Sequence, residues 1–184
     1  MAGSALAPRV LVVQGSRFGQ SEKIAKAVCE VLQSRGMLTD LVALDRSTRP
    51  DPLVHTAFAL VTSVRYGHFD KNAKRLLKRH RTWVDGVPTL LMTVSLTART
   101  PEKRDPAVHV YTRKFLEQTA WQPTMVEVVA GALEYPRYNW FDRMMIRFIM
   151  RITGGETNPT ANIEYTDWTQ VTTAATTFTH HLRV

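Results

Sequence analysis

The sequence has few of the features that mark special classes of protein. Its 184 residues include one cysteine, Cys29, which cannot form an internal disulfide, a cysteine-rich zinc site or a CxxC redox pair. This cysteine content is typical of a reducing compartment, so any redox chemistry must come from a bound cofactor. No apolar run approaches the roughly 20 residues that span a bilayer. The first ten residues, MAGSALAPRV, also do not predict a secretory signal.

Signatures of metal sites and of hydrolytic nucleophiles are missing as well. His180 and His181 are adjacent, the other histidines are scattered, and the HExxH pattern does not occur. We therefore expect no metal site. The nucleophile pattern GxSxG is also missing, so nothing in the sequence supports a hydrolase of that kind.

Acidic residues are too few to balance the basic ones. Lysine and arginine number 24 against 16 aspartates and glutamates, for a net charge of +8. Such an excess indicates an anionic partner, which could be nucleic acid, anionic lipid or an acidic small molecule. Seven of the basic residues lie between Arg65 and Arg81. A nucleic-acid face would interleave aromatic side chains with these charges, and this one does not, so we favour a solvated helix face and expect no nucleic-acid partner.

Short apolar runs alternate with helical patterns along the chain. Strands are predicted at 9–14, 37–43, 57–63, 88–95 and 125–132, and helices at 20–34, 70–83, 105–120 and 167–181. Asp105 and Pro106 define the start of the third helix as an N-cap and a first-turn proline. The last helix is expected to carry Trp168, Val171, Ala175 and Phe178 on one side. This alternation predicts an α/β fold, a doubly wound five-stranded parallel sheet in a single domain over 1–184, with an insertion at 133–155 after strand five.

Three polar loops follow predicted strands, at 15–21, 63–69 and 95–104. In a doubly wound sheet, ligands bind beyond the carboxyl ends of the strands near a topological switch point. The first loop, GSRFGQS, offers hydroxyl groups, a glycine and a helix N-terminus, which together can hold a terminal phosphate. An ordinary turn in which Ser21 caps the following helix fits the same spacing. The other two loops favour a mononucleotide with a planar ring.

The insertion contains a helical pattern of unusual composition, WFDRMMIRFIMRI at 140–152. Arg143, Arg147 and Arg151 fall on a single stripe, while apolar side chains beginning with Trp140 and Phe141 cover most of the rest. One interpretation is a helix that lies in an anionic membrane interface. The other is a helix buried on both sides or in a subunit contact, and hence a homo-oligomer. The sequence alone leaves both open.

Five motifs together resemble one protein family. They are YPRYNWFDRMMIRFIM at 135–150, GGETN at 154–158, YTDW at 165–168, VRYGHF at 64–69 and PEKRDP at 101–106. The chain is similar in these motifs to the flavodoxin-like, quinone-dependent protoporphyrinogen IX dehydrogenases, over nearly its whole length. The resemblance implies a flavodoxin fold, one FMN, and oxidation of protoporphyrinogen IX to protoporphyrin IX in haem biosynthesis, with a membrane quinone as electron acceptor. It also implies a peripheral position on the cytoplasmic side of the cell membrane, or on a mitochondrial membrane in a eukaryote.

The same resemblance assigns roles to residues. It implies that the first loop holds the FMN phosphate, that the second and third loops flank the ribityl chain and the ring, and that the return from the insertion closes the site. The FMN residues so implied are Ser16, Arg17, Phe18, Gly19, Gln20, Ser21, Ser63, Val64, Arg65, Tyr66, Gly67, Thr93, Val94, Ser95, Leu96, Thr97, Gly154, Gly155 and Glu156. Phe18 stands where the family commonly has a polar residue, which leaves contacts from backbone N–H groups intact.

The chemistry of the substrate adds two further assignments by position. Arg65, Arg99 and Arg137 are the candidate partners of the two substrate propionates. His68 and Tyr66 are the nearest candidates for a catalytic acid or base. Two alternative functions share the scaffold, namely a flavodoxin-like NAD(P)H:quinone reductase and a non-enzymatic electron-transfer flavodoxin. The insertion counts against both, and the positive charge counts against a carrier, since such carriers are typically acidic.

Overall fold

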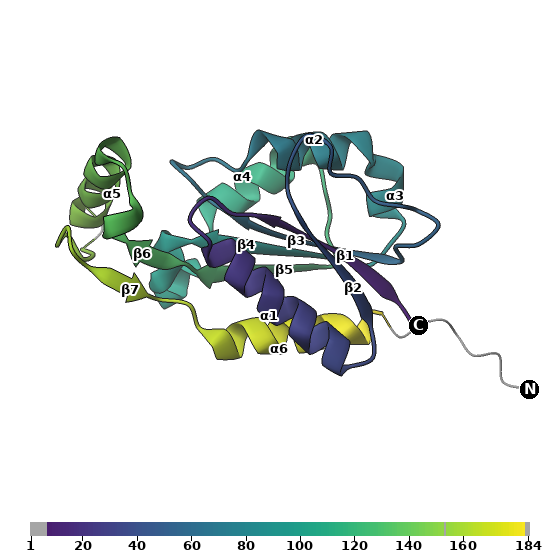
Figure 1. The fold of residues 1–184 in the computed structure, drawn as a ribbon. Coiled ribbons are helices and arrows are strands. Elements are labelled where there is room, and N and C mark those ends of the chain that lie inside the picture. Colours follow the sequence, from purple (N-terminus) through teal and green to yellow (C-terminus); the bar gives the residue numbers. More distant parts are fainter. Residues whose placement is uncertain (1–6, 153, 183–184) are drawn as a thin grey trace, which may run out of the picture.

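A five-stranded parallel sheet forms the centre of the computed structural model, which describes residues 7–152 and 154–182. The strands are β1 (Arg9–Gly15), β2 (Leu38–Ala43), β3 (Ala57–Ser63), β4 (Thr89–Ser95) and β5 (Met125–Ala130). They lie in the order β2-β1-β3-β4-β5 with every neighbouring pair parallel (Figure 1). This is the strand order of flavodoxin-like doubly wound folds, so the predicted fold class is confirmed.

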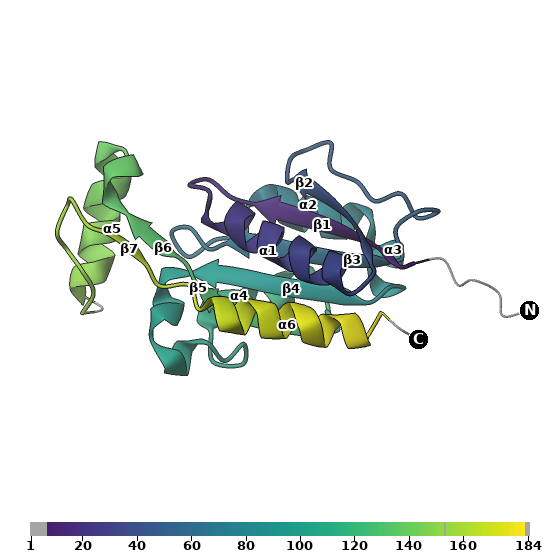
Figure 2. The same ribbon diagram turned by 60° about the horizontal axis from the view of Figure 1, so that its bottom comes forward.

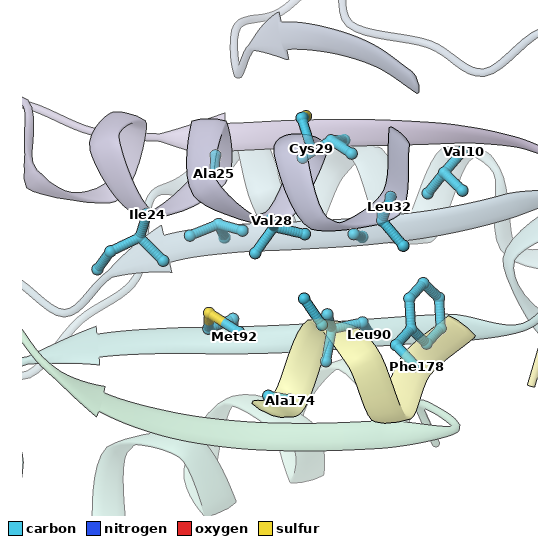
Figure 3. Close-up of a cluster of buried hydrophobic side chains, with 14 of the residues drawn as sticks. Val10, Ile24, Ala25, Val28, Cys29, Leu32, Leu90, Met92, Ala174 and Phe178 are labelled. Atoms are coloured by element: carbon cyan, nitrogen blue, oxygen red, sulfur yellow. The ribbon is translucent and has the colours of Figure 1, made fainter. Parts of the chain in front are cut away.

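Helices cover both faces of this sheet. One face packs against α1 (Gln20–Ser34) and α6 (Trp168–His180), and the other against α2 (Lys71–Arg79), α3 (Arg81–Asp85) and α4 (Val110–Thr119) (Figures 1 and 2). Successive residues of a strand point to opposite faces, so Val10 and Val12 join the core beneath α1, drawn in Figure 3, whereas Leu11 and Val13 join the core beneath α2. Burial on both faces explains why these strands read as continuous apolar runs.

Two helices differ from the sequence prediction. The helix predicted over 70–83 begins as expected, because the Asp70 carboxylate accepts the N–H of Asn72, but it is divided at His80 into α2 and α3. The helix predicted to begin at Asp105 begins later in the chain, at Val110. The carboxylate of Asp105 accepts the N–H of Ala107, and its carbonyl accepts that of His109, so Asp105 closes a separate turn. The helix α4 instead begins directly after His109, which occupies its N-cap position.

In α6, Val171, Ala175 and Phe178 are buried, whereas Trp168 in the first turn is 38% exposed. The predicted end of the fifth strand needs correction. The fifth strand was expected to reach residue 132, yet β5 ends at Ala130, which pairs with Ser95, the last residue of β4. Beyond Ser95 the neighbouring strand no longer offers ladder partners, so β5 stops there.

The insertion forms a separate unit beyond the carboxyl end of β5. It contains β6 (Ala132–Glu134), the short 3-10 turn η3 (Tyr135–Arg137) and α5 (Trp140–Ile152), and β7 (Asn162–Glu164) returns antiparallel to β6 (Figure 2). The sequence analysis missed this two-stranded ribbon, because each strand has only three residues. A small core of Leu133, Tyr135, Tyr138 and Met150 holds α5 against the ribbon. In the described ranges no helix combines the length and the apolar character needed to cross a bilayer.

Candidate functional site

A cavity lies at the carboxyl ends of β1, β3 and β4, where the three polar loops converge. β1 and β3 are neighbours in the sheet, but the chain between them passes through β2 on the outer edge, so this is the topological switch point. The residues that line the cavity are Ser16, Arg17, Phe18, Gln20, Ser21, Ser63, Val64, Arg65, Tyr66, Gly67, Val94, Ser95, Leu96, Thr97, Tyr111, Gly131, Ala132, Tyr138, Asp142, Ile146, Ile149 and Met150. Each of the three loops supplies part of this lining.

The first loop has the local structure of an anion site. Its Ser16 hydroxyl accepts the N–H of Gly19 at 2.9 Å, and Gly19 adopts φ 97°, a conformation that favours glycine. No described side chain caps the N-terminus of α1, which follows directly. The buried hydroxyl of Ser21 has no hydrogen-bond partner among the described residues. Free N–H groups and an unpaired hydroxyl at one helix end suit a phosphate, and Ser21 does not serve as the helix cap that the alternative interpretation required.

The second loop is a tight turn whose two central residues, Tyr66 and Gly67, have φ 48° and 76°. Arg65 and His68 pair across it through two backbone hydrogen bonds of 2.8 Å. Positive φ at both central positions is typical of two-residue hairpin turns. The turn brings Arg65 and Tyr66 to the cavity, whereas His68 is exposed and does not line it. Of the two predicted acid or base candidates, only Tyr66 therefore lies at the cavity.

The third loop continues from β4 into the 3-10 turn η1 (Leu96–Arg99). Ser95 caps this turn, since its hydroxyl oxygen accepts the N–H of Thr97 at 3.3 Å. Ser95, Leu96 and Thr97 line the cavity. Thr93 is fully buried behind them and accepts a hydrogen bond from the Thr112 hydroxyl, so it supports the loop from the core.

The inner face of α5 closes the cavity with a buried carboxylate that the sequence analysis did not single out. Asp142 is 1% exposed, and its Oδ1 lies 2.6 Å from Arg65 Nη2 and in contact with the Tyr66 hydroxyl. Its Oδ2 lies 3.8 Å from Arg17 Nη2. The signal was present in the sequence, because Asp142 is the one acid in an otherwise apolar and basic helix.

Several predicted site residues lie elsewhere in the described part of the chain. Neither Gly19 nor Thr93 lines the cavity, and neither does the segment Gly154 to Glu156. This segment fixes the end of α5, since the N–H of Gly155 donates to the Met150 carbonyl and the Glu156 carbonyl accepts the Tyr135 hydroxyl.

The three arginines assigned to the propionates also have different positions. Arg65 lines the cavity, where Asp142 already binds it. Arg99 donates to the carbonyl of Leu96 at 3.1 Å, and Arg137 forms an exposed ion pair with Glu134 at 2.9 Å. Neither of these two lines the cavity, so of the three arginines assigned to the propionates only Arg65 is placed to meet a carboxylate there.

The outer face of α5 is exposed and strongly apolar. Trp140, Phe141, Met144, Phe148 and Ile152 are all exposed, with Trp140 reaching 76%. A shallow groove on this face is lined by Trp140, Arg143, Met144, Arg147, Phe148, Arg151 and Thr157. The predicted arginine stripe is therefore present beside exposed aromatic residues, although Arg143 is half-buried and donates to the Tyr138 carbonyl at 3.3 Å.

Comparison with known proteins identifies the family. The flavodoxin domain model matches residues 11–160. Protoporphyrinogen IX dehydrogenase [quinone] of Escherichia coli K12 is 37% identical over 172 residues, which cover 94% of this chain and 95% of the relative. The chain belongs to the family of quinone-dependent protoporphyrinogen IX dehydrogenases. The relative of the same name from Leishmania major is 38% identical, covering 93% of this chain and 74% of its own.

Solved structures agree with the family in fold. An archaeal flavodoxin superimposes with a TM-score of 0.55 at 8% identity, covering 96% of this chain and 99% of its own. The Flv1 flavodiiron core of Synechocystis gives a TM-score of 0.58 at 12% identity, covering 97% of this chain and 37% of its own. At such low identity these likenesses concern the fold alone. The resemblance found in the sequence motifs is thus confirmed for both family and fold.

The contacts of Asp142 give a first testable prediction. Asp142→Asn removes a buried charge that binds Arg65, and a hydrogen bond to a charged group contributes on the order of 1.5 kcal/mol. We expect α5 to open more often, so that trypsin cleaves after Arg147 and Arg151 about tenfold faster. Asp85→Asn, which breaks an exposed ion pair with Arg81 on α3, is the matched control. Equal cleavage rates in the two variants would show that Asp142 does not hold α5 in place.

Proposed function

We propose that the protein oxidises protoporphyrinogen IX to protoporphyrin IX with bound FMN, and passes the electrons to a membrane quinone as a step of haem biosynthesis. The observation that supports this most is the near-complete match to relatives named for that activity, at 37% identity over 94% of the chain. The cavity at the switch point supports it independently, because it offers a phosphate site and a flanking aromatic ring.

The residues of the cavity fit FMN. The uncapped N-terminus of α1 and the unpaired Ser21 hydroxyl would bind the phosphate, and Ser16 would hold the loop in place through Gly19. Tyr66 and Leu96 line the cavity on loops that would flank a planar ring. Bound FMN supplies the two-electron redox chemistry, while the protein provides binding and orientation.

The chain also offers groups for the substrate. Arg65 lies at the cavity and would bind a propionate through its guanidinium, in competition with Asp142. Ile146, Ile149 and Met150 of α5 add an apolar side to the same cavity and would exclude water from the reacting atoms. Burial raises the pKa of Tyr138, so this hydroxyl stays protonated beside them.

We further propose that the outer face of α5 docks on an anionic membrane and brings the site close to its quinone. Exposed Trp140 and Phe148 would enter the acyl boundary, while Arg147 and Arg151 would meet lipid phosphates. This arrangement corresponds to a peripheral protein on the cytoplasmic side of the cell membrane, or on a mitochondrial membrane in a eukaryote.

Anaerobic mixing of the FMN-loaded protein with protoporphyrinogen IX tests the proposed activity. We expect the flavin absorbance to bleach while porphyrin fluorescence appears, and NADH and NADPH to reduce the flavin far more slowly. Fast reduction by NADPH with none by protoporphyrinogen would instead identify an NAD(P)H:quinone reductase. A protein that neither donor reduces would behave as an electron carrier.

A further inference from the structure

A buried histidine is connected to the cavity by two hydroxyl groups. His109 is 3% exposed, and its Nε2 lies 3.1 Å from Thr97 Oγ1. Thr97 Oγ1 in turn lies 2.8 Å from Ser95 Oγ. Thr97 and Ser95 both line the cavity, whereas His109 does not. An unbroken chain of hydrogen bonds therefore joins the cavity to a titratable group that has no role in the site described above.

The contacts of the other ring nitrogen indicate which tautomer is present. The Thr112 hydroxyl lies 2.7 Å from His109 Nδ1 and donates its own hydrogen to Thr93 at 3.1 Å. Its oxygen is thus free to accept from Nδ1–H. The backbone N–H of Thr112 also points at Nδ1, over a longer 3.3 Å, and a protonated Nδ1 could not accept it. Because the hydrogen of the Thr112 hydroxyl is directed at Thr93, a contact of 2.7 Å between its oxygen and Nδ1 requires a hydrogen on Nδ1. We therefore assign the hydrogen to Nδ1 and the lone pair to Nε2.

This tautomer gives the chain of hydrogen bonds a direction. With a lone pair at Nε2, the Thr97 hydroxyl donates to His109, and its oxygen then accepts from the Ser95 hydroxyl. The chain consequently points from the cavity toward the imidazole. Burial, and then the charge of Lys103, lower the pKa of His109, so the ring is neutral near pH 7 and able to accept a proton. The ring of Tyr111 packs edge-on beside it at 5.6 Å.

We propose that His109, acting through Thr97 and Ser95, takes up the proton that the substrate releases on oxidation. This inference rests on the proposed function. In each two-electron step the porphyrinogen would lose a hydride to the bound flavin and a proton from a nitrogen or a bridge carbon. That proton bonds to Ser95 Oγ while the Ser95 proton passes to Thr97 and the Thr97 proton to Nε2. The imidazolium returns its proton by the same route to water between steps.

The tautomer can be measured without substrate or cofactor. Nitrogen NMR of the histidine-labelled protein should show His109 protonated at Nδ1 above its pKa. Thr97→Val, which keeps the shape of the side chain and removes the hydroxyl, should shift the Nε2 signal. Protonation at Nε2 in the parent would overturn the proposed direction.

Three variants test the role in the reaction. Thr97→Val breaks the relay, and His109→Asn removes the imidazole but keeps a residue that caps α4 well. Since general base catalysis contributes at least about 100-fold, we expect both variants to slow flavin reduction by protoporphyrinogen by about that factor. We also expect them to lose the fall in rate that the parent shows as the pH drops through the pKa of His109. Thr97→Ser should restore most of the rate and that pH dependence.

The outcomes separate this inference from the proposed function. If protoporphyrinogen does not reduce the flavin of the parent, the proposed function is wrong, and the relay falls with it. If it reduces the parent, yet Thr97→Val keeps the same rate and pH profile, only the relay is wrong. FMN affinity is measured for every variant by quenching of flavin fluorescence, so that all rates are compared at saturating FMN. A loss of rate that disappears at saturating FMN would also contradict the relay.

Discussion

Replacing both Ser16 and Ser21 by glutamate should abolish FMN binding. Both side chains line the cavity at the N-terminus of α1, where two new carboxylates would face the phosphate. At about 4 Å and an effective dielectric constant near 20, one pair of like charges costs about 4 kcal/mol. A single such contact would already weaken binding roughly 1000-fold. Titration of flavin fluorescence in the purified protein measures the effect.

A matched control separates local repulsion from a change in net charge. Thr173 and Thr177 are exposed on α6, far along the chain from the first loop, and Thr173→Glu with Thr177→Glu adds the same charge. We expect this control to bind FMN like the parent. If the Ser16 and Ser21 variant still purified with bound FMN, the first loop would not be the phosphate site.

Replacing Arg147 and Arg151 by glutamine should weaken binding to anionic vesicles by about 30-fold. Each arginine near an anionic surface contributes on the order of 1 kcal/mol, so the pair contributes about 2 kcal/mol. Adding Arg143→Gln extends the expected loss toward 100-fold at most, because Arg143 is half-buried and bonded to Tyr138. Sedimentation with vesicles at low and high salt measures both the affinity and its salt dependence.

The control for this experiment removes the same charge from another helix. Lys78 and Arg79 are exposed on α2, and Lys78→Gln with Arg79→Gln should leave vesicle binding near the parent level. If the Arg147 and Arg151 variant bound anionic vesicles as tightly as the parent at low salt, the docking proposal would be wrong. The exposed apolar face would then fit a subunit contact, and the oligomeric state in solution would show it.

The sheet could be predicted from the sequence because its strands leave an unambiguous pattern. Strands buried on both faces read as short apolar runs, and β1, β3 and β4 match their predicted spans to within one residue. The turn after Asp105 could not be predicted in the same way. An aspartate followed by proline can start a helix or close a turn, and the local sequence does not distinguish the two. Here Asp105 closes a turn, and α4 begins only after the buried His109.

The sequence predicts only the parts of the site that lie on loops at the carboxyl ends of the strands. Loops that follow neighbouring parallel strands must meet, which brings Ser21, Tyr66 and Ser95 to one cavity. Chain position does not give the direction of a side chain, so His68 and Arg99 turned out to lie outside it. Asp142 could have been singled out as the one acid of its helix, but its contacts at the cavity depend on how α5 packs on the loops, which no local pattern gives.

The pairing of β6 with β7 makes the inserted segment separable from the sheet. Ala132 and Glu164 face each other in the ribbon, so the segment leaves and rejoins the body of the protein at adjacent points. An inserted segment whose two ends lie side by side does not push apart the elements before and after it, which here are β5 and α6. Substitutions on the outer face of α5 should therefore leave the sheet intact, and that face can adapt to a different surface while the inner face keeps its place at the cavity.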